Sequence, residues 1–296
     1  MFVEACAKAM QFTRPMVIST AHVDGTVDSG FGAYTVINRE GWAITAAHCV
    51  HTLNQIKMDA EKMREVDAYN ASHPDDKKQY DPKWLKAQSI WWGNDFIKFD
   101  QIHILYELDL ALVKLVGLPA NYVTEFPVLK DPESLHQGMS LCRLGYPFMK
   151  INTQFEPDQN RFKLEGLKPD LPQQYFPYEG MLTRIVLRGI VKPDGTITNV
   201  GPNGIVPLFI EASTPGLKGQ SGGPIVDVKG NMIGMQSQTA NLPLGFGDMQ
   251  VDGKYMPEQF INVGLGVHVK TIIAALDKFG IKYKSESDDD GYRIIG

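Results

Sequence analysis

The sequence has few cysteines and no long apolar run. Its three cysteines, Cys6, Cys49 and Cys142, are odd in number and widely spaced, which excludes a disulfide framework. They do not cluster with histidines at metal-ligand spacing, so we expect no bound metal. We interpret them as free thiols in a reducing compartment. Because no stretch of about 20 apolar residues occurs, we also expect no membrane-spanning helix.

An excess of basic charge is also lacking. The chain has 29 lysines and arginines against 34 acidic residues, a net charge of −5, and no basic stripe with interleaved aromatics. This balance argues against nucleic acid or an anionic membrane as the main partner. The N-terminal segment carries Glu4 where a secretory signal would carry basic residues, and Lys8 interrupts its apolar character. We therefore expect no signal peptide and, with unpaired cysteines, a cytoplasmic location.

What the sequence does contain is typical of a soluble β-protein. Its 296 residues suggest about two domains, and 43% hydrophobic with 21% charged residues is an ordinary globular composition. Short apolar or alternating segments bounded by turn residues predict many strands. With few helices, they indicate an all-β protein of two barrels or sandwiches. The predicted β-segments are 16–50, 102–112, 139–144, 184–191, 208–212, 224–228, 231–236 and 263–269.

Two helices interrupt this pattern. Apolar residues from Leu53 to Val66 recur every three to four positions, and Thr52 with Gln55 fits a capping box. We therefore predict a helix over about 52–70, and a terminal helix over 270–279. Residues 117–136, with three prolines, are interpreted as a linker, and residues 152–180 as a long loop insertion.

A serine surrounded by glycines follows the polar loop 213–218. In Gly219-Gln220-Ser221-Gly222-Gly223-Pro224, the glycines permit a sharp turn that leaves the hydroxyl reachable. They also free backbone N–H groups to face a ligand oxygen. A flexible turn is the alternative interpretation.

An aspartate stands out on the apolar segment that begins at Ile102. The alternation from Ile102 to Leu112 places Asp109 midway along a strand, where a carboxylate is costly unless it has a partner. Taken alone, Asp109 would more often be a strand-end acid, and His48 a core histidine with satisfied hydrogen bonds.

Three segments together resemble the signatures of trypsin-like serine proteases. They are Thr45-Ala46-Ala47-His48-Cys49, the run Asp109–Leu115, and Gly219–Pro224, in the family's His, Asp, Ser order. The resemblance covers roughly residues 16–270. It implies two six-stranded antiparallel β-barrels with the site in the cleft between them. We predict an N-terminal barrel with an inserted helix over 1–127, and a C-terminal barrel with a terminal helix over 128–296.

The resemblance also assigns roles. Ser221 would be the nucleophile, His48 the base that takes its proton, and Asp109 the group that orients the imidazole. The N–H groups of Gly219 and Ser221 would form an oxyanion hole. We expect a serine endopeptidase acting on a protein or peptide through an acyl-enzyme, without metal or organic cofactor.

Several residues differ from those of secreted trypsin-like proteases. Gln220 replaces the aspartate that pairs with a new N-terminus in secreted members, so activation by that route is not expected. Cys49 lacks its usual disulfide partner, since Ala33 stands there. These features are closer to bacterial and HtrA-type proteases. Nothing after residue 280 is long enough for a PDZ domain, so we expect a lone protease domain.

Specificity is assigned by alignment to the motif. The pocket for the side chain before the cleaved bond should have its base near Thr214, Pro215 and Gly216. Its far wall should be near Ser237, Gln238 and Thr239. Because no acid stands at the base, a preference for Arg or Lys is not supported, and a small or medium apolar residue is favoured. Ser237 is also expected to support Asp109.

Two other functions remain open at this stage. A protease-like binding module could use the cleft to hold a peptide with little or no turnover, and the same three residues could hydrolyse esters. The insertions at 52–70 and 152–180 could cover the cleft or bind a regulatory partner. They could equally be tolerated surface additions.

Overall fold

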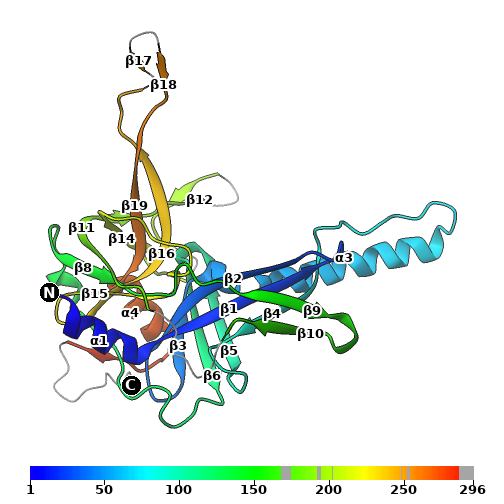
Figure 1. Ribbon diagram of the computed structural model, residues 1–296, viewed down its shortest axis with the longest axis horizontal. Helices are drawn as coiled ribbons and strands as arrows, with labels where there is room; N and C mark the ends of the chain where they lie inside the picture. Colours follow the sequence, from blue (N-terminus) through cyan, green and yellow to red (C-terminus); the bar gives the residue numbers. More distant parts are fainter. Residues whose placement is uncertain (168–174, 192–194, 202, 248, 252–253, 287–296) are drawn as a thin grey trace.

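The chain folds around two antiparallel β-sheets. The computed structural model describes residues 1–286, except 168–174, 192–194, 202, 248 and 252–253. The first sheet runs in the order β4 (Leu85–Trp91), β1 (Thr13–His22), β2 (Val27–Val36), β3 (Trp42–Thr45), β6 (Leu110–Val116) and β5 (Lys98–Leu105). These six strands curl into a half-barrel (Figure 1).

The second sheet closes into a barrel. Its order is β15 (Pro224–Val226), β8 (Ser140–Arg143), β11 (Tyr178–Leu187), β14 (Leu208–Ala212), β19 (Phe260–His268) and β16 (Met232–Pro243). A further pairing of β15 with β16 closes the ring, and β7 (Val128–Leu129) and β20 (Lys284–Ser285) extend it. The predicted all-β class is confirmed. Of the two six-stranded antiparallel barrels that were expected, the second sheet forms a closed barrel and the first a half-barrel.

The loop that carries Ser221 joins the two sheets. Ala33 N–H, on β2, donates to the Ser221 carbonyl (2.8 Å), and the Thr35 hydroxyl donates to the Gly222 carbonyl (3.3 Å). On the other side, the Gly222 N–H donates to Gln236 O on β16 (2.8 Å). Hydrogen bonds from both sheets therefore fix the position of Ser221.

The helix expected over about 52–70 is confirmed, but the capping box expected at its start is not. A short helix, α2 (Ala47–Val50), leads through His51 in a helical conformation into α3 (Thr52–Ser72), which projects away from the barrels (Figure 1). The capping box is wrong because Thr52 lies inside this continuous turn; no side-chain cap is formed. Instead, buried Asp59 accepts from the Leu85 N–H (3.1 Å) and ties the helix to β4.

The segment 152–180 is not a plain loop. It contains a hairpin, β9 (Asn152–Glu156) and β10 (Arg161–Glu165), joined by a 3-10 turn at Pro157–Gln159. Phe155 and Phe162 face each other across it, with ring centroids 4.9 Å apart. The Ser29 hydroxyl of β2 donates to Thr153 (2.7 Å), so the hairpin lies against the first sheet. The part at 168–174 lies outside the described residues.

The N-terminal segment forms a helix that the sequence analysis did not predict. In α1 (Val3–Phe12), Ala5, Ala9 and Phe12 are buried on one face against β8 and β15. The helix brings the Cys6 thiol to 3.7 Å from that of Cys142, although both remain free thiols. The predicted terminal helix is confirmed as α4 (Val269–Lys278). No helix of the described residues is long and apolar enough to cross a membrane.

Candidate active site

His48 and Asp109 come from two neighbouring turns of the first sheet. His48 lies on α2, directly after β3, and Asp109 follows a 3-10 turn (Tyr106–Leu108) that connects β5 to β6. The expected position of Asp109 in mid-strand is wrong. Its backbone is left-handed, with φ 48°, and the chain turns a corner there. This corner directs the carboxylate at the N-terminus of α2.

The Asp109 carboxylate accepts hydrogen bonds from three donors. The His48 ring Nδ1 lies 2.9 Å from Oδ2 and the His48 backbone N–H 3.0 Å from Oδ1. The Ser237 hydroxyl donates to Oδ2 at 2.5 Å. Because a carboxylate only accepts, Nδ1 carries the proton and Nε2 is left as the basic nitrogen.

Burial and hydrogen bonding act in opposite directions on this pair. Burial disfavours the charged form of each group, which by itself would raise the pKa of Asp109 and lower that of His48. The hydrogen bonds and the mutual attraction outweigh burial. As a result, the pKa of Asp109 is lowered and that of His48 is raised well above 6.5. The pair therefore stabilises an imidazolium.

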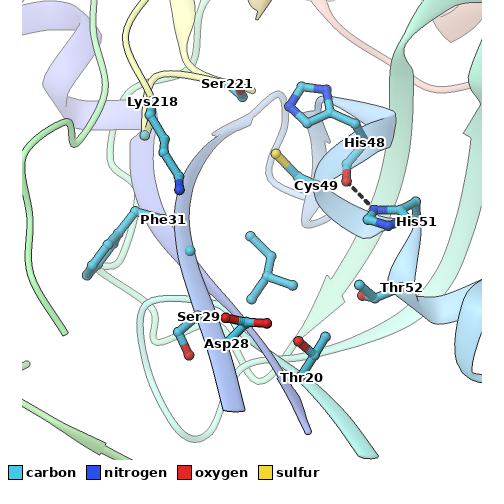
Figure 2. Close-up of a pocket in the computed structure, with 13 residues that line it drawn as sticks. Thr20, Asp28, Ser29, Phe31, His48, Cys49, His51, Thr52, Lys218 and Ser221 are labelled. Atoms are coloured by element: carbon cyan, nitrogen blue, oxygen red, sulfur yellow. Dashed lines mark hydrogen bonds between the residues drawn. The ribbon is translucent and has the colours of Figure 1, made fainter. Parts of the chain in front are cut away.

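The Ser221 hydroxyl lies at the cleft between the sheets. Ser221, His48 and Gly219 line one cavity of about 330 Å³, together with Lys218 and residues of β1 and β2. Figure 2 shows the His48 ring and Ser221 at the same end of this cavity, with the Lys218 side chain extending along it. A second cavity on the other side of His48 includes Asp109, Ser237 and Gln238. The cleft thus continues on both sides of the imidazole.

The Ser221 hydroxyl does not point at the His48 ring. Ser221 Oγ donates to the Ser237 carbonyl at 3.2 Å. Among the described residues, no hydrogen bond joins it to the His48 ring. Such contacts often form only when substrate is bound, and a change of one side-chain torsion would redirect the hydroxyl.

The glycine-rich loop leaves two N–H groups without an acceptor. Among the described residues, neither the Gly219 nor the Ser221 N–H donates a hydrogen bond. Gly219 has φ +100°, and a Cβ there would lie 2.5 Å from the Tyr146 carbonyl oxygen. Only glycine therefore fits this turn, in which the two N–H groups are available for a ligand oxygen.

Gln220 holds this loop from behind. It is fully buried, and its Oε1 accepts from the Leu217 N–H (3.0 Å) while Nε2 donates to Phe176 O (3.4 Å). Its backbone N–H also donates to Leu217 O (2.9 Å). The amide side chain thus occupies the place of the aspartate in secreted relatives and braces the loop with neutral hydrogen bonds.

The two predicted pocket walls lie next to each other. The Thr239 hydroxyl donates to Gly216 O (2.7 Å), which joins the wall containing Thr214, Pro215 and Gly216 to that containing Ser237 and Gln238. The sequence analysis missed the groups that lie between them. Gln236 donates from Nε2 to Gln238 O (3.0 Å) and packs against Gly216, and its Oε1 accepts from buried Arg143 (3.3 Å). An arginine inside the apolar strand 139–144 was the signal for this contact.

No group of three or more His, Cys, Asp or Glu side chains that could hold a metal occurs in the described part of the chain. The groups that can take part in chemistry are the Ser221 hydroxyl, the His48 imidazole with a fixed tautomer, the partly buried Asp109 carboxylate and two available N–H groups.

Solved protease structures are similar to this chain over most of its length. The match to the Rv3671c protease from M. tuberculosis in its active form covers 95% of this chain and 86% of that chain. Its TM-score is 0.50 and the sequence identity is 13%. The HtrA-type protease AlgW with tripeptide matches at a TM-score of 0.47 and 16% identity, over 93% of this chain. The chain spans 61% of the AlgW chain. No curated protein sequence matches it.

A model of the trypsin-like peptidase domain matches residues 30–235, which is more than half of the chain. This segment includes His48, Asp109 and Ser221, so all three motifs of the sequence-based resemblance fall inside the match. The chain belongs to the family of trypsin-like peptidase domains.

Proposed function

We propose that this protein is a serine endopeptidase that cleaves peptide bonds through an acyl-enzyme on Ser221. The observation that carries the proposal is the set of three donors on Asp109, which fixes the His48 tautomer with Nε2 free at the cavity that also holds Ser221. A serine hydroxyl is a weak nucleophile at neutral pH and needs such a base.

Each group has one role in the proposed reaction. His48 Nε2 takes the proton of Ser221 Oγ as the oxygen attacks the carbonyl carbon, and Asp109 stabilises the resulting imidazolium without becoming protonated. The N–H groups of Gly219 and Ser221 receive the developing oxyanion. His48 then gives the proton to the leaving amine, and water hydrolyses the acyl-enzyme by the same steps.

A fluorophosphonate probe tests this proposal directly. We expect it to label folded protein at pH 8 at about one probe per chain, on Ser221, because only an activated serine reacts readily. Ser221→Ala should abolish labelling. Ser213→Ala is the matched control, since the Ser213 hydroxyl only accepts from the Met181 N–H (3.0 Å) and should leave labelling unchanged. Folded protein that resists the probe would instead favour a peptide-binding module without turnover.

Replacing Gln220 tests whether its side chain positions the oxyanion loop. Gln220→Ala removes the acceptor of the Leu217 N–H and the donor to Phe176. We expect kcat to fall by about 10²-fold with a smaller change in KM, because the Gly219 N–H is misplaced mainly for the transition state. The exposed Gln159→Ala, on the hairpin turn, is the control. A change confined to KM would contradict a positioning role.

A further inference from the structure

A buried arginine without a carboxylate partner lies behind the pocket walls. Arg143, at the end of β8, is fully buried, and it forms no ion pair with any Asp or Glu of the described residues. Its Nη1 donates to Gln236 Oε1 (3.3 Å) and its Nη2 to the Thr214 hydroxyl. Within the described parts of the chain, its Nε has no hydrogen-bond partner. The guanidinium is held by neutral groups only.

This arrangement is costly for the free protein. A buried cation loses its hydration, and only a nearby anion or several strong acceptors restore the loss. Burial lowers the pKa of Arg143 to about 10, so the group is still a cation near neutral pH. The ring of Tyr178, whose centroid lies 5.4 Å from Cζ, adds only a modest attraction. Arg143 therefore carries a positive charge with which no acidic side chain of the described residues forms an ion pair.

The cation lies where the two walls begin. Thr214 starts one wall, Gln236 precedes the other, and the guanidinium packs on the bare backbone of Gly264 of β19, where a Cβ would overlap Nη1. The Ser237 carbonyl, one residue after Gln236, accepts from Ser221 Oγ. Arg143 is thus bonded directly to Thr214 of the first predicted wall and to Gln236, the residue before the second.

We propose that Arg143 binds the carboxylate of an acidic side chain, aspartate or glutamate, on the residue before the cleaved bond. This specificity rests on the proposed endopeptidase function of the same site. The carboxylate replaces Gln236 Oε1 as the acceptor on Arg143, and a charged acceptor forms the stronger hydrogen bond to a guanidinium. The apolar preference favoured from the sequence is replaced, because Arg143 was not then placed at the pocket.

The test uses peptidyl diphenyl phosphonates that differ only in the side chain next to phosphorus: glutamate, glutamine, alanine or leucine. Such probes bond covalently to an activated serine, so their labelling rate reports the pocket without requiring turnover. Glutamate and glutamine have nearly the same shape, and their ratio isolates the charge. We expect the glutamate probe to label Ser221 at least about tenfold faster than the glutamine probe.

Variants then assign the ratio to Arg143. In Arg143→Met the ratio of the glutamate to the glutamine labelling rate should fall to about one or below. The variant should still fold, because an apolar side chain replaces a buried cation that has no ion-pair partner among the described residues. The matched control is Arg161→Met, since Arg161 lies on the hairpin and pairs with Glu156 (2.9 Å). It should keep the wild-type ratio.

The outcomes separate this proposal from the proposed function. Suppose that a small fluorophosphonate without a recognition side chain labels Ser221. Acidic specificity is then overturned if the glutamine, alanine or leucine probe reacts as fast as the glutamate probe, or if no peptidyl probe reacts. A glutamate preference that survives in Arg143→Met also overturns it. If even the small fluorophosphonate fails on folded protein, the endopeptidase function itself fails.

Discussion

Replacing Ser221 by alanine, His48 by alanine, or both together should lower kcat for a peptide substrate by the same factor, on the order of 10⁶. The reason is that the proposed nucleophile and base act as one unit. Without His48, the Ser221 hydroxyl keeps its proton, and without Ser221 the imidazole has no proton to accept in the first step. The second substitution therefore causes no further loss of kcat. The prediction depends on the proposed function.

Measurement of kcat and KM for the two single variants and the double variant gives the test. KM should change little, because neither side chain is assigned to hold the substrate in the ground state. His51→Ala is the matched control, since His51 donates from Nδ1 to His48 O (2.7 Å) and lines the same cavity (Figure 2). Among the described residues, its ring forms no hydrogen bond with Asp109. It should retain most of the activity. Losses that multiply in the double variant would contradict a single catalytic unit.

The three site residues could be found from sequence because each lies in a short motif with a characteristic run of residue types. The motif marks the residue, although the position of the glycine-rich turn at Ser221 depends on contacts with distant residues such as Ala33 and Tyr146. Asp109 was found as well, but its left-handed backbone conformation was not predicted. Apolar alternation continues through Leu108 and Leu110, so the pattern gives no sign of the left-handed corner between them.

The cluster of Arg143, Thr214 and Gln236 could not be predicted in the same way. Arg143, Thr214 and Gln236 lie on three segments separated by 71 and 93 residues from the arginine, and only the closed second barrel brings them together. The charge of Arg143 within an apolar strand was visible, but a charged residue at a strand end more often faces solvent. Whether the Arg143 side chain faces solvent or the interior depends on the pairing of β8 with β11 and β15.

Long-range packing also explains the two misjudged segments. The helix α1 is only ten residues long, and its burial depends on contacts with β8 and β15 that lie more than 100 residues away. The hairpin β9–β10 is surrounded by proline and charge, which the sequence analysis took as loop signals. Its two phenylalanines pair across the strands, a contact that polar composition does not reveal.

The second large effect concerns Gly222, which lies between the two sheets directly after Ser221. Its φ is +86°, and a Cβ there would overlap the Ala33 carbonyl oxygen and the Thr45 hydroxyl. The Ala33 oxygen is backbone and cannot move unless β2 moves. Since the Ala33 N–H also holds the Ser221 carbonyl, such a movement separates the nucleophile from His48.

We therefore expect Gly222→Ala to lower the free energy of unfolding by more than about 4 kcal/mol, in the range reserved for severe steric conflicts. Gly138→Ala is the matched control: its φ is +88°, but a Cβ there meets nothing within 4 Å. That variant should lose only about 1–2 kcal/mol, the cost of a left-handed alanine. Urea unfolding measures both, and an unchanged m-value shows that the difference is one of stability. Equal losses in the two variants would mean that the sheets adjust to the added methyl group, and the position of Ser221 would then not depend on this contact.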